Sequence, residues 1–151
     1  MPMPWTYRQA TREWRAFLAL AREVMDLETD NLTYTAVQGV LQAFRRRLTA
    51  QQAIDFAQVL PSVLRALFVA DWQIEPPVPP GTRAEWTAEA MALRPHHNLT
   101  PPNCVAATAY ALRKSVPRAD LERVLATLPP FAADFWSTPG IDPATLGPGI
   151  V

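Results

Sequence analysis

The sequence predicts an all-α fold, with about eight helices in two related four-helix units that pack as one compact helical domain. Three observations lead to this prediction. Apolar residues recur at three- and four-residue spacing, and no segment of useful length alternates apolar and polar residues as a half-buried strand does. Threonines and prolines stand where helices would begin. Finally, residues Ala36–Phe68 are similar to Cys104–Trp136 at a constant offset and without a gap.

The internal similarity rests on pattern more than on identity, because apolar positions, a basic pair and a Leu-Pro step all recur in phase. The identical pairs are Val37/Val105, Ala43/Ala111, Arg45/Arg113, Leu60/Leu128 and Pro61/Pro129. A repeat of this length indicates one supersecondary unit used twice, each copy burying what the other cannot. We therefore expect residues 1–151 to form a single domain, divided into a first helical repeat (7–72), a Pro-rich linker (73–81), a second helical repeat (82–136) and an irregular tail (137–151).

The first two helices of the first repeat are predicted from apolar stripes. One helix starts after Thr6 and runs to about Leu27, and acidic and polar residues then interrupt the pattern. Thr33 or Thr35 is expected to cap the next helix. The inward residues of these two helices are Trp14, Phe17, Leu18, Ala21, Val24 and Met25, then Val37, Val40, Leu41, Phe44 and Leu48.

The third and fourth helices are predicted from their start signals. Thr49 and Gln52 have the spacing of a capping box, in which Thr49 is the cap and Gln52 reaches back. Pro61 cannot continue that helix but suits the first turn of another. The fourth helix is therefore expected from about Ser62 to Asp71.

The linker and the helices of the second repeat are predicted from prolines and from capping-box spacing. Ile74–Gly81 contains four prolines in eight positions, which predicts an extended and stiff segment. Thr82 and Glu85 have capping-box spacing before a short helix that bears Trp86. The three later helices are expected to start near Thr100-Pro101, Pro117 and Pro129-Pro130.

The run from Leu41 to Phe68 carries a family signature. It consists of Phe44-Arg45-Arg46-Arg47-Leu48-Thr49, then Val59-Leu60-Pro61, then Leu64-Arg65-Ala66-Leu67-Phe68. This signature resembles the bacterial domain-of-unknown-function family 2267, and the resemblance covers roughly residues 12 to 136. It implies an all-helical fold that repeats this unit, and it implies no activity or catalytic residues, because the family has none assigned. The second copy departs from the signature at Pro117, which replaces the Thr, and at Ala133, which replaces the Arg.

The composition of the chain limits the classes of partner and the cellular compartment that we expect. Formal net charge is zero, with 14 basic and 14 acidic residues, which argues against nucleic acid as the main ligand. Cys104 is the only cysteine, so a reducing compartment is the default. The N-terminus has no apolar signal-peptide core, and no stretch approaches the roughly 18 uncharged apolar residues of a membrane helix. We expect a soluble cytoplasmic protein without a membrane or nucleic-acid partner.

The basic run Arg45-Arg46-Arg47 has two interpretations. It could grip phosphate or an acidic partner. Alternatively, basic residues at the C-terminus of a helix interact favourably with its macrodipole. We favour the second, because Arg113-Lys114 repeats the location. A DNA-reading helix-turn-helix is not favoured either, because the segment Ala50–Val59 carries no Lys or Arg to reach bases and phosphates.

Candidates for catalysis and metal binding are sparse. Cys104 begins a predicted helix, where the macrodipole would lower its pKa, but its counterpart Ala36 suggests that only small size is needed there. His96 and His97 lie in a predicted loop, and Cys104 and Glu89 stand at no recognisable metal spacing from them. The sequence therefore predicts no catalytic residue, no cofactor and no metal site.

The five tryptophans divide into core and edge positions. Trp14, Trp86 and Trp136 fall on core-facing stripes, whereas Trp5 lies in the Pro-rich start and Trp72 lies beside the linker. Exposed tryptophan marks a partner surface. The possible partner surface therefore comprises Trp5, Trp72, Arg45, Arg46 and Arg47.

These observations favour a non-enzymatic protein-interaction or self-association module, whose partner is another protein or a second copy. The alternative is a binder of an apolar small molecule between the two repeats. Its cavity would be lined by Trp14, Phe17, Phe68, Trp86 or Trp136. A third hypothesis, an enzyme, rests only on Cys104, His96 and His97.

Overall fold

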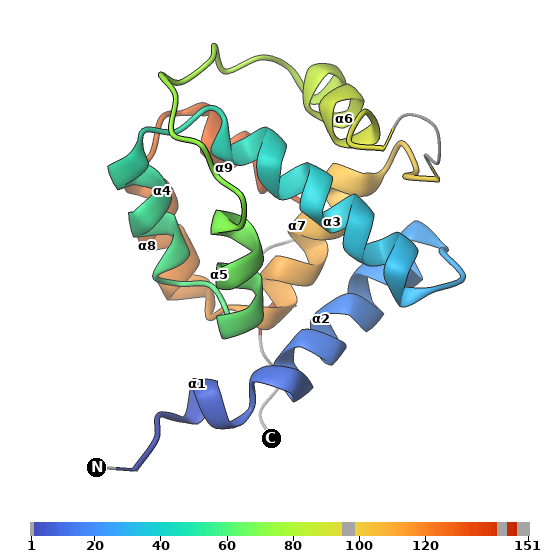
Figure 1. Ribbon diagram of the computed structural model, residues 1–151, viewed down its shortest axis with the longest axis vertical. Helices are drawn as coiled ribbons and strands as arrows, with labels where there is room; N and C mark the ends of the chain where they lie inside the picture. Colours follow the sequence, from blue (N-terminus) through green and yellow to red (C-terminus); the bar gives the residue numbers. More distant parts are fainter. Residues whose placement is uncertain (1, 95–98, 142–144, 148–151) are drawn as a thin grey trace.

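The computed structural model describes residues 2–94, 99–141 and 145–147, and all regular structure within these residues is helical (Figure 1). The described helices are α1 (Trp5–Arg8), α2 (Ala10–Met25), α3 (Asp30–Arg45), α4 (Ala50–Ala57), α5 (Ser62–Val69), α6 (Arg83–Met91), α7 (Cys104–Ser115), α8 (Arg118–Thr127) and α9 (Phe131–Phe135). The predicted all-α class is confirmed.

The first predicted helix is divided in two and ends early. Gln9 has backbone angles of φ −108° and ψ 14°, which are not helical, and it separates α1 from α2. Asp26 then adopts the left-handed conformation, with φ 54° and ψ 46°, and its N–H caps the carbonyl of Arg22. A residue in this conformation ends a helix, so α2 stops at Met25 and not near Leu27.

The cap of α3 lies earlier than predicted. The side chain of Thr29 accepts a hydrogen bond from the N–H of Leu32 at 3.2 Å, and the helix begins at Asp30. Thr33 and Thr35 lie inside α3 and donate to backbone carbonyls one turn earlier. The prediction of Thr33 or Thr35 was wrong because the polar run before them contains the cap itself.

Three other start signals are confirmed, whereas α7 begins at Cys104, after Asn103, and not at Thr100-Pro101. In the capping box of α4, the N–H of Gln52 donates to Thr49 Oγ1 at 3.2 Å, and the N–H of Thr49 donates to Gln52 Oε1 at 2.9 Å. Thr82 caps α6 by accepting from the N–H of Glu85 at 3.3 Å. Pro61 directly precedes α5.

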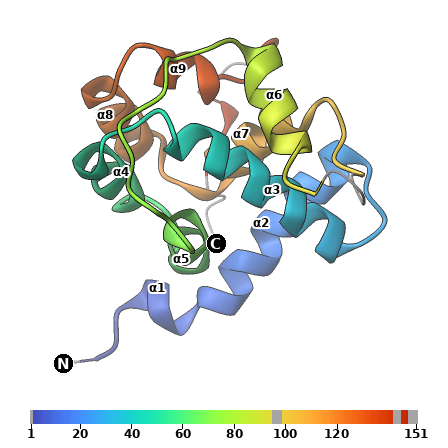
Figure 2. The same cartoon turned by 45° about the horizontal axis from the view of Figure 1, so that its top comes forward.

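The two predicted repeats exchange their first helices, which pack against α3 and α7. Figures 1 and 2 show α2 running along α7, and α6 lying against α3. Each first helix of a predicted repeat thus covers the second helix of the other repeat. Gly39 makes the α3–α6 approach possible, since a Cβ at this position would lie 2.6 Å from the carbonyl oxygen of Ala90.

One aromatic core joins the two halves. The ring of Phe44 lies 4.8 Å from that of Phe56, 4.9 Å from Phe135 and 5.2 Å from Trp136, measured between centroids. Trp86 and Trp136 are fully buried as predicted, but Trp14 is only partly buried. Because the cluster contains residues from both predicted repeats, neither half encloses its own core.

Candidate functional site

The residues predicted as a partner surface lie in two separate places. Trp72 and the three arginines lie where the chain leaves α3 and where the linker crosses it, whereas Trp5 lies in α1 at the opposite end of α5 (Figure 1).

Arg45 is buried, and only 7% of it is exposed. Its Nη1 donates to the carbonyl oxygens of Phe68 and Ala70, each at 3.0 Å, and its guanidinium lies 5.6 Å from the ring centroid of Trp72. Burial lowers the pKa of Arg45, and the nearby Asp71 carboxylate partly opposes this shift. Arg45 thus ties the end of α5 to the end of α3.

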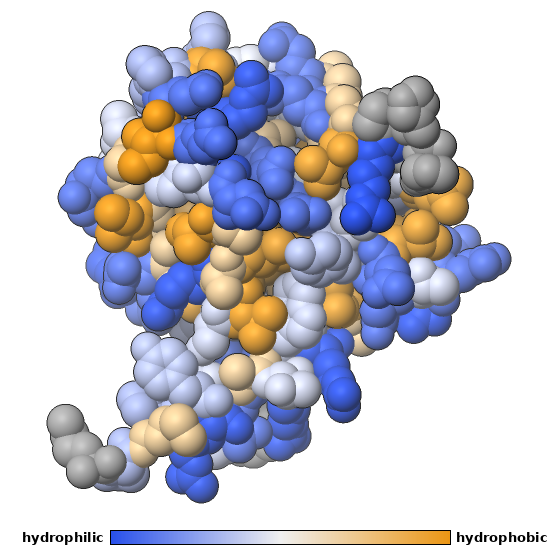
Figure 3. All heavy atoms as spheres, viewed as in Figure 1, coloured by the Kyte–Doolittle hydropathy of each residue, from blue (hydrophilic) through white to orange (hydrophobic). Residues whose placement is uncertain are grey.

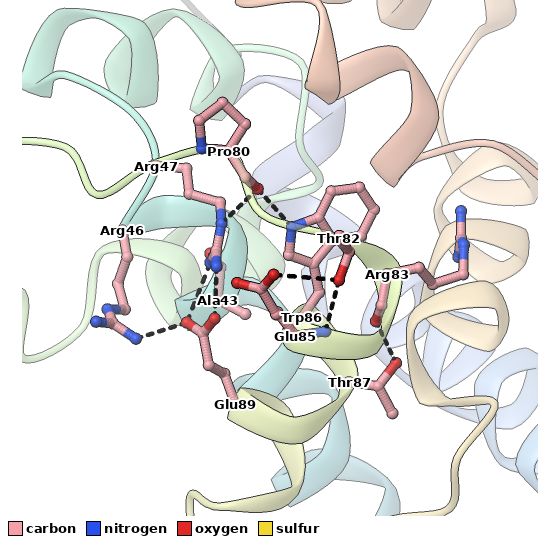
Figure 4. A network of polar contacts seen from close by, with 10 residues as sticks. All are labelled: Ala43, Arg46, Arg47, Pro80, Thr82, Arg83, Glu85, Trp86, Thr87 and Glu89. Carbon is pink, nitrogen blue, oxygen red and sulfur yellow. Dashed lines mark hydrogen bonds and ion pairs between the residues drawn. The ribbon is translucent and has the colours of Figure 1, made fainter.

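Arg47 is also buried, and it fastens three segments together (Figure 4). Its Nη1 donates to the carbonyl of Ala43 at 2.7 Å, one turn earlier in α3, and its Nε donates to the carbonyl of Pro80 at 2.8 Å. Both Nη atoms also contact the carboxylate of Glu89 in α6. The Pro80 carbonyl accepts a second hydrogen bond, from Trp86 Nε1 at 2.7 Å.

Arg46 is the one arginine of this run that reaches solvent. Its side chain is 53% exposed and forms an ion pair with Glu89, the carboxylate that also binds Arg47. The interpretation of the run as a structural device thus fits the geometry, though hydrogen bonds to specific carbonyls do more than the macrodipole alone. Arg45 and Arg47 lie inside because carbonyls at helix ends and in the linker supply their acceptors.

Two surface hollows lie beside this region and a third lies at the start of α3, and the residues predicted to line an inter-repeat cavity line none of the three. One of about 320 Å³ is lined by Gly39, Gln42, Ala43, Arg46, Glu89, Ala92 and Leu93. A smaller one of about 70 Å³ is lined by Arg45, Arg46, Leu48, Trp72, Gln73, Glu75, Pro76 and Val78. A third, of about 370 Å³, is lined by Asn31, Leu32, Tyr34, Thr35, Arg94, Leu99 and Thr100.

The predicted lining residues instead take part in core packing. Phe17, Phe68, Trp86 and Trp136 are buried, and Trp14 stacks on Phe17 with ring centroids 5.9 Å apart. No distance or contact of these residues tests an apolar small-molecule site between the repeats, which stays a prediction.

The N-terminal arm (residues 2–9) presents exposed apolar side chains. Met3 is 58% exposed, Trp5 68% and Tyr7 52%. Figure 3 shows the arm projecting from the body, and the Thr6 and Ser62 hydroxyls, 2.8 Å apart, hold it against the start of α5. Sequence reasoning singled out Trp5 and missed Tyr7, although a second aromatic residue so close to Trp5 in the Pro-rich start was a signal for it.

Cys104 is enclosed, with an exposed fraction of 0%. Burial raises the pKa of its thiol to about 11, and hydrogen bonds from backbone N–H groups oppose this shift only in part. The expected lowering by the helix macrodipole was wrong because desolvation of the thiolate outweighs it. His96 and His97 lie outside the described residues.

Within 2–94, 99–141 and 145–147, no three His, Cys, Asp or Glu side chains gather as a potential metal site. Each helix in this part of the chain also falls short of the length and apolar character needed to cross a membrane.

Comparison with known proteins places this architecture in a family. The family model described as Uncharacterized conserved protein (DUF2267) matches residues 14–135, a span that runs from α2 to the end of α9. No curated protein matches the chain. The family match confirms the resemblance seen in the signature from Phe44 to Phe68. The chain belongs to the DUF2267 family of uncharacterised conserved proteins.

Proposed function

We propose that this chain is a non-enzymatic protein-interaction module that associates with itself through the N-terminal arm. The observation that carries the proposal is the group of exposed apolar side chains on the arm, Met3, Trp5 and Tyr7. Tryptophan and tyrosine supply large contact areas with a polar tip, and they are enriched at the energetic centres of protein interfaces. A segment at the edge of the molecule that exposes both is suited to docking.

A second copy is the partner that the charge favours. Formal net charge is zero, with 14 basic and 14 acidic residues, so two copies approach without the repulsion between like net charges. Proteins near zero net charge associate more readily than strongly charged ones.

The chemistry of Cys104 supports the non-enzymatic part of the proposal. Its thiol is enclosed and its pKa is raised to about 11, so at neutral pH it is protonated and shielded from substrates. Arg45 and Arg47, which could have bound a phosphate, spend their hydrogen bonds inside the chain. These groups stabilise the fold, and the arm is therefore the feature that we assign to binding.

The test is sedimentation velocity over a range of protein concentrations. We expect the wild-type chain to form dimers as concentration rises and Trp5→Ala to stay monomeric, because truncation removes the largest exposed ring of the arm. Ile54→Ala is the matched control, since Ile54 is 47% exposed but lies in α4, away from the arm. A wild-type chain that stays monomeric at every concentration would refute the proposal of self-association.

A further inference from the structure

We infer that the arm of one copy binds the proline strip of a second copy. The proline strip is the exposed stretch Ile74–Pro80 that follows α5. The inference rests on the proposed self-association and names the surface that receives the arm.

The strip presents its prolines to solvent. Pro76, Pro77, Pro79 and Pro80 are exposed, whereas Val78 is turned partly inward. Proline fixes its own φ near −65° and drives the residue before it into an extended conformation. Since four of five consecutive residues here are proline, the backbone is restricted to an extended path of the polyproline II type.

Hydrogen bonds hold the strip in place before any partner arrives. The N–H of Val78 donates to the carbonyl of Arg46 at 3.0 Å. The carbonyl of Pro80 accepts from both Arg47 Nε and Trp86 Nε1 (Figure 4). Gly81 ends the strip with φ +71°, a conformation that favours glycine. A segment already fixed in its bound shape loses little conformational entropy on binding.

The arm has the chemistry that recognises such a strip. Aromatic rings pack against exposed prolines in extended segments, which is how proline-rich ligands are read by aromatic-lined grooves. Trp5 supplies an exposed ring on the same face of α1 as Arg8, and Ile74, 68% exposed, extends the apolar surface of the strip. Charge is complementary as well, because exposed Arg8 lies on the arm and exposed Glu75 lies on the strip.

The arm and the strip of one chain lie at opposite ends of α5 (Figures 1 and 2). The arm is held at Ser62, the first residue of α5, and the strip begins after its last turn. An eight-residue helix spans about 12 Å. The hydrogen bonds between Thr6 and Ser62 keep the arm at the end of α5 away from its own strip, so the strip that the arm binds is that of a second copy.

A mixing experiment tests this inference. The arm variant is Trp5→Ala, and the strip variant is the double substitution Pro77→Ala with Pro79→Ala. We expect each variant alone to show a dimer dissociation constant at least about tenfold above wild type. Mixed in equal amounts, the two variants should associate more tightly than either alone, because an intact arm then meets an intact strip. Sedimentation velocity with a fluorescent label on one variant measures this.

The controls separate the possible failures. Gln73→Ala, just before the strip, should dimerise like wild type, and circular dichroism should show unchanged helix content in every variant. A strip variant that dimerises like wild type beside a monomeric arm variant would overturn this inference and leave the proposed self-association standing. A mixture no tighter than its components would also overturn it. A monomeric wild-type chain would remove the proposed function itself.

Discussion

Arg45 and Arg113 occupy matching places in the two halves of the molecule, and both are buried. Nη1 of Arg45 donates to the carbonyl of Phe68 at 3.0 Å, and Nε of Arg113 donates to the carbonyl of Trp136 at 2.6 Å. In each half the arginine near the end of one helix thus binds a carbonyl at the end of the matching later helix, since Phe68 lies in the last turn of α5 and Trp136 directly follows α9. A pair of long-range contacts in register supports the hypothesis of a duplicated unit.

These two arginines, the anchors of their halves, differ in the groups that balance the positive charge of the guanidinium. Arg45 has a second carbonyl, the ring of Trp72 and the charge of the nearby Asp71, whereas Arg113 forms an ion pair with the carboxylate of Glu122 at 3.0 Å. The difference shows that the carbonyl anchor is common to both halves while the counter-charge is not.

The residues two positions further on differ more. Arg47 and its counterpart Ser115 each bind a carbonyl one turn earlier, that of Ala43 or Ala111. Only the longer Arg47 extends beyond that carbonyl to Pro80 and Glu89. The first half therefore has a clamp, which we define as Arg47 with its partners Pro80 and Glu89. Ser115 is too short to form the matching contacts in the second half.

The largest effect is expected from breaking this clamp. Arg47→Met should lower the free energy of unfolding by about 3 kcal/mol, because Glu89 and two carbonyls lose a buried donor. Urea unfolding followed by circular dichroism measures it. Arg46→Met is the control and should cost less than about 1 kcal/mol, since its ion pair is half exposed. Equal losses for the two variants would show that the clamp has no special role.

The two anchors should differ by a smaller amount. Arg45→Met should cost about 2–3 kcal/mol, because it leaves two carbonyls without their donor. Arg113→Met should cost about 1 kcal/mol less, because it orphans one carbonyl and Glu122 remains half exposed to water. Urea unfolding of both variants gives the comparison, and a larger loss for Arg113→Met would reverse our account of the counter-charge.

The α3–α6 crossing offers a third comparison. Gly39→Ala should destabilise the fold by about 1–3 kcal/mol, since the added Cβ meets the backbone of Ala90 and not a side chain that could move. The matching position in α7 is Ala107, which already carries a Cβ and is fully buried. Thermal unfolding of Gly39→Ala beside Ala107→Gly tests the asymmetry. A gain in stability for Gly39→Ala would mean that α6 can move away without loss.

The smallest effect concerns Cys104 and its counterpart Ala36. Burial raises the pKa of the Cys104 thiol to about 11, so its contribution to stability is complete below about pH 9 and declines as pH rises toward 11. The slope should approach about 1 kcal/mol per pH unit. Urea unfolding from pH 8 to pH 10.5 should show this decline in wild type beyond that of Cys104→Ala. Parallel pH profiles would mean that the thiol is not protected in the folded state.

Local signals in the sequence were sufficient where the partners are neighbours. The capping box of Thr49 and Gln52 was readable because both hydrogen bonds span three residues. The cap at Thr29 has the same kind of signal, but it stands in a polar run that looked like an interruption. The break at Gln9 carries no proline or glycine to announce it.

Long-range partners were beyond local reasoning. The burial of Arg45 and Arg47 depends on the carbonyls of Phe68 and Pro80, which are distant in sequence. The periodicity of apolar residues identifies the buried face of α2. It does not identify α7, in the other half, as the helix that covers this face. Among the predicted surface residues, Trp5 was readable because the Pro-rich start offers no apolar stripe to bury its ring.

The most direct test of self-association through the arm is sedimentation equilibrium of the wild-type chain and of Trp5→Ala at matched concentrations. We predict a monomer–dimer equilibrium for the wild type and the mass of a single chain for the variant. A wild type with the mass of one chain throughout, or a variant that dimerises as tightly as the wild type, would contradict the account.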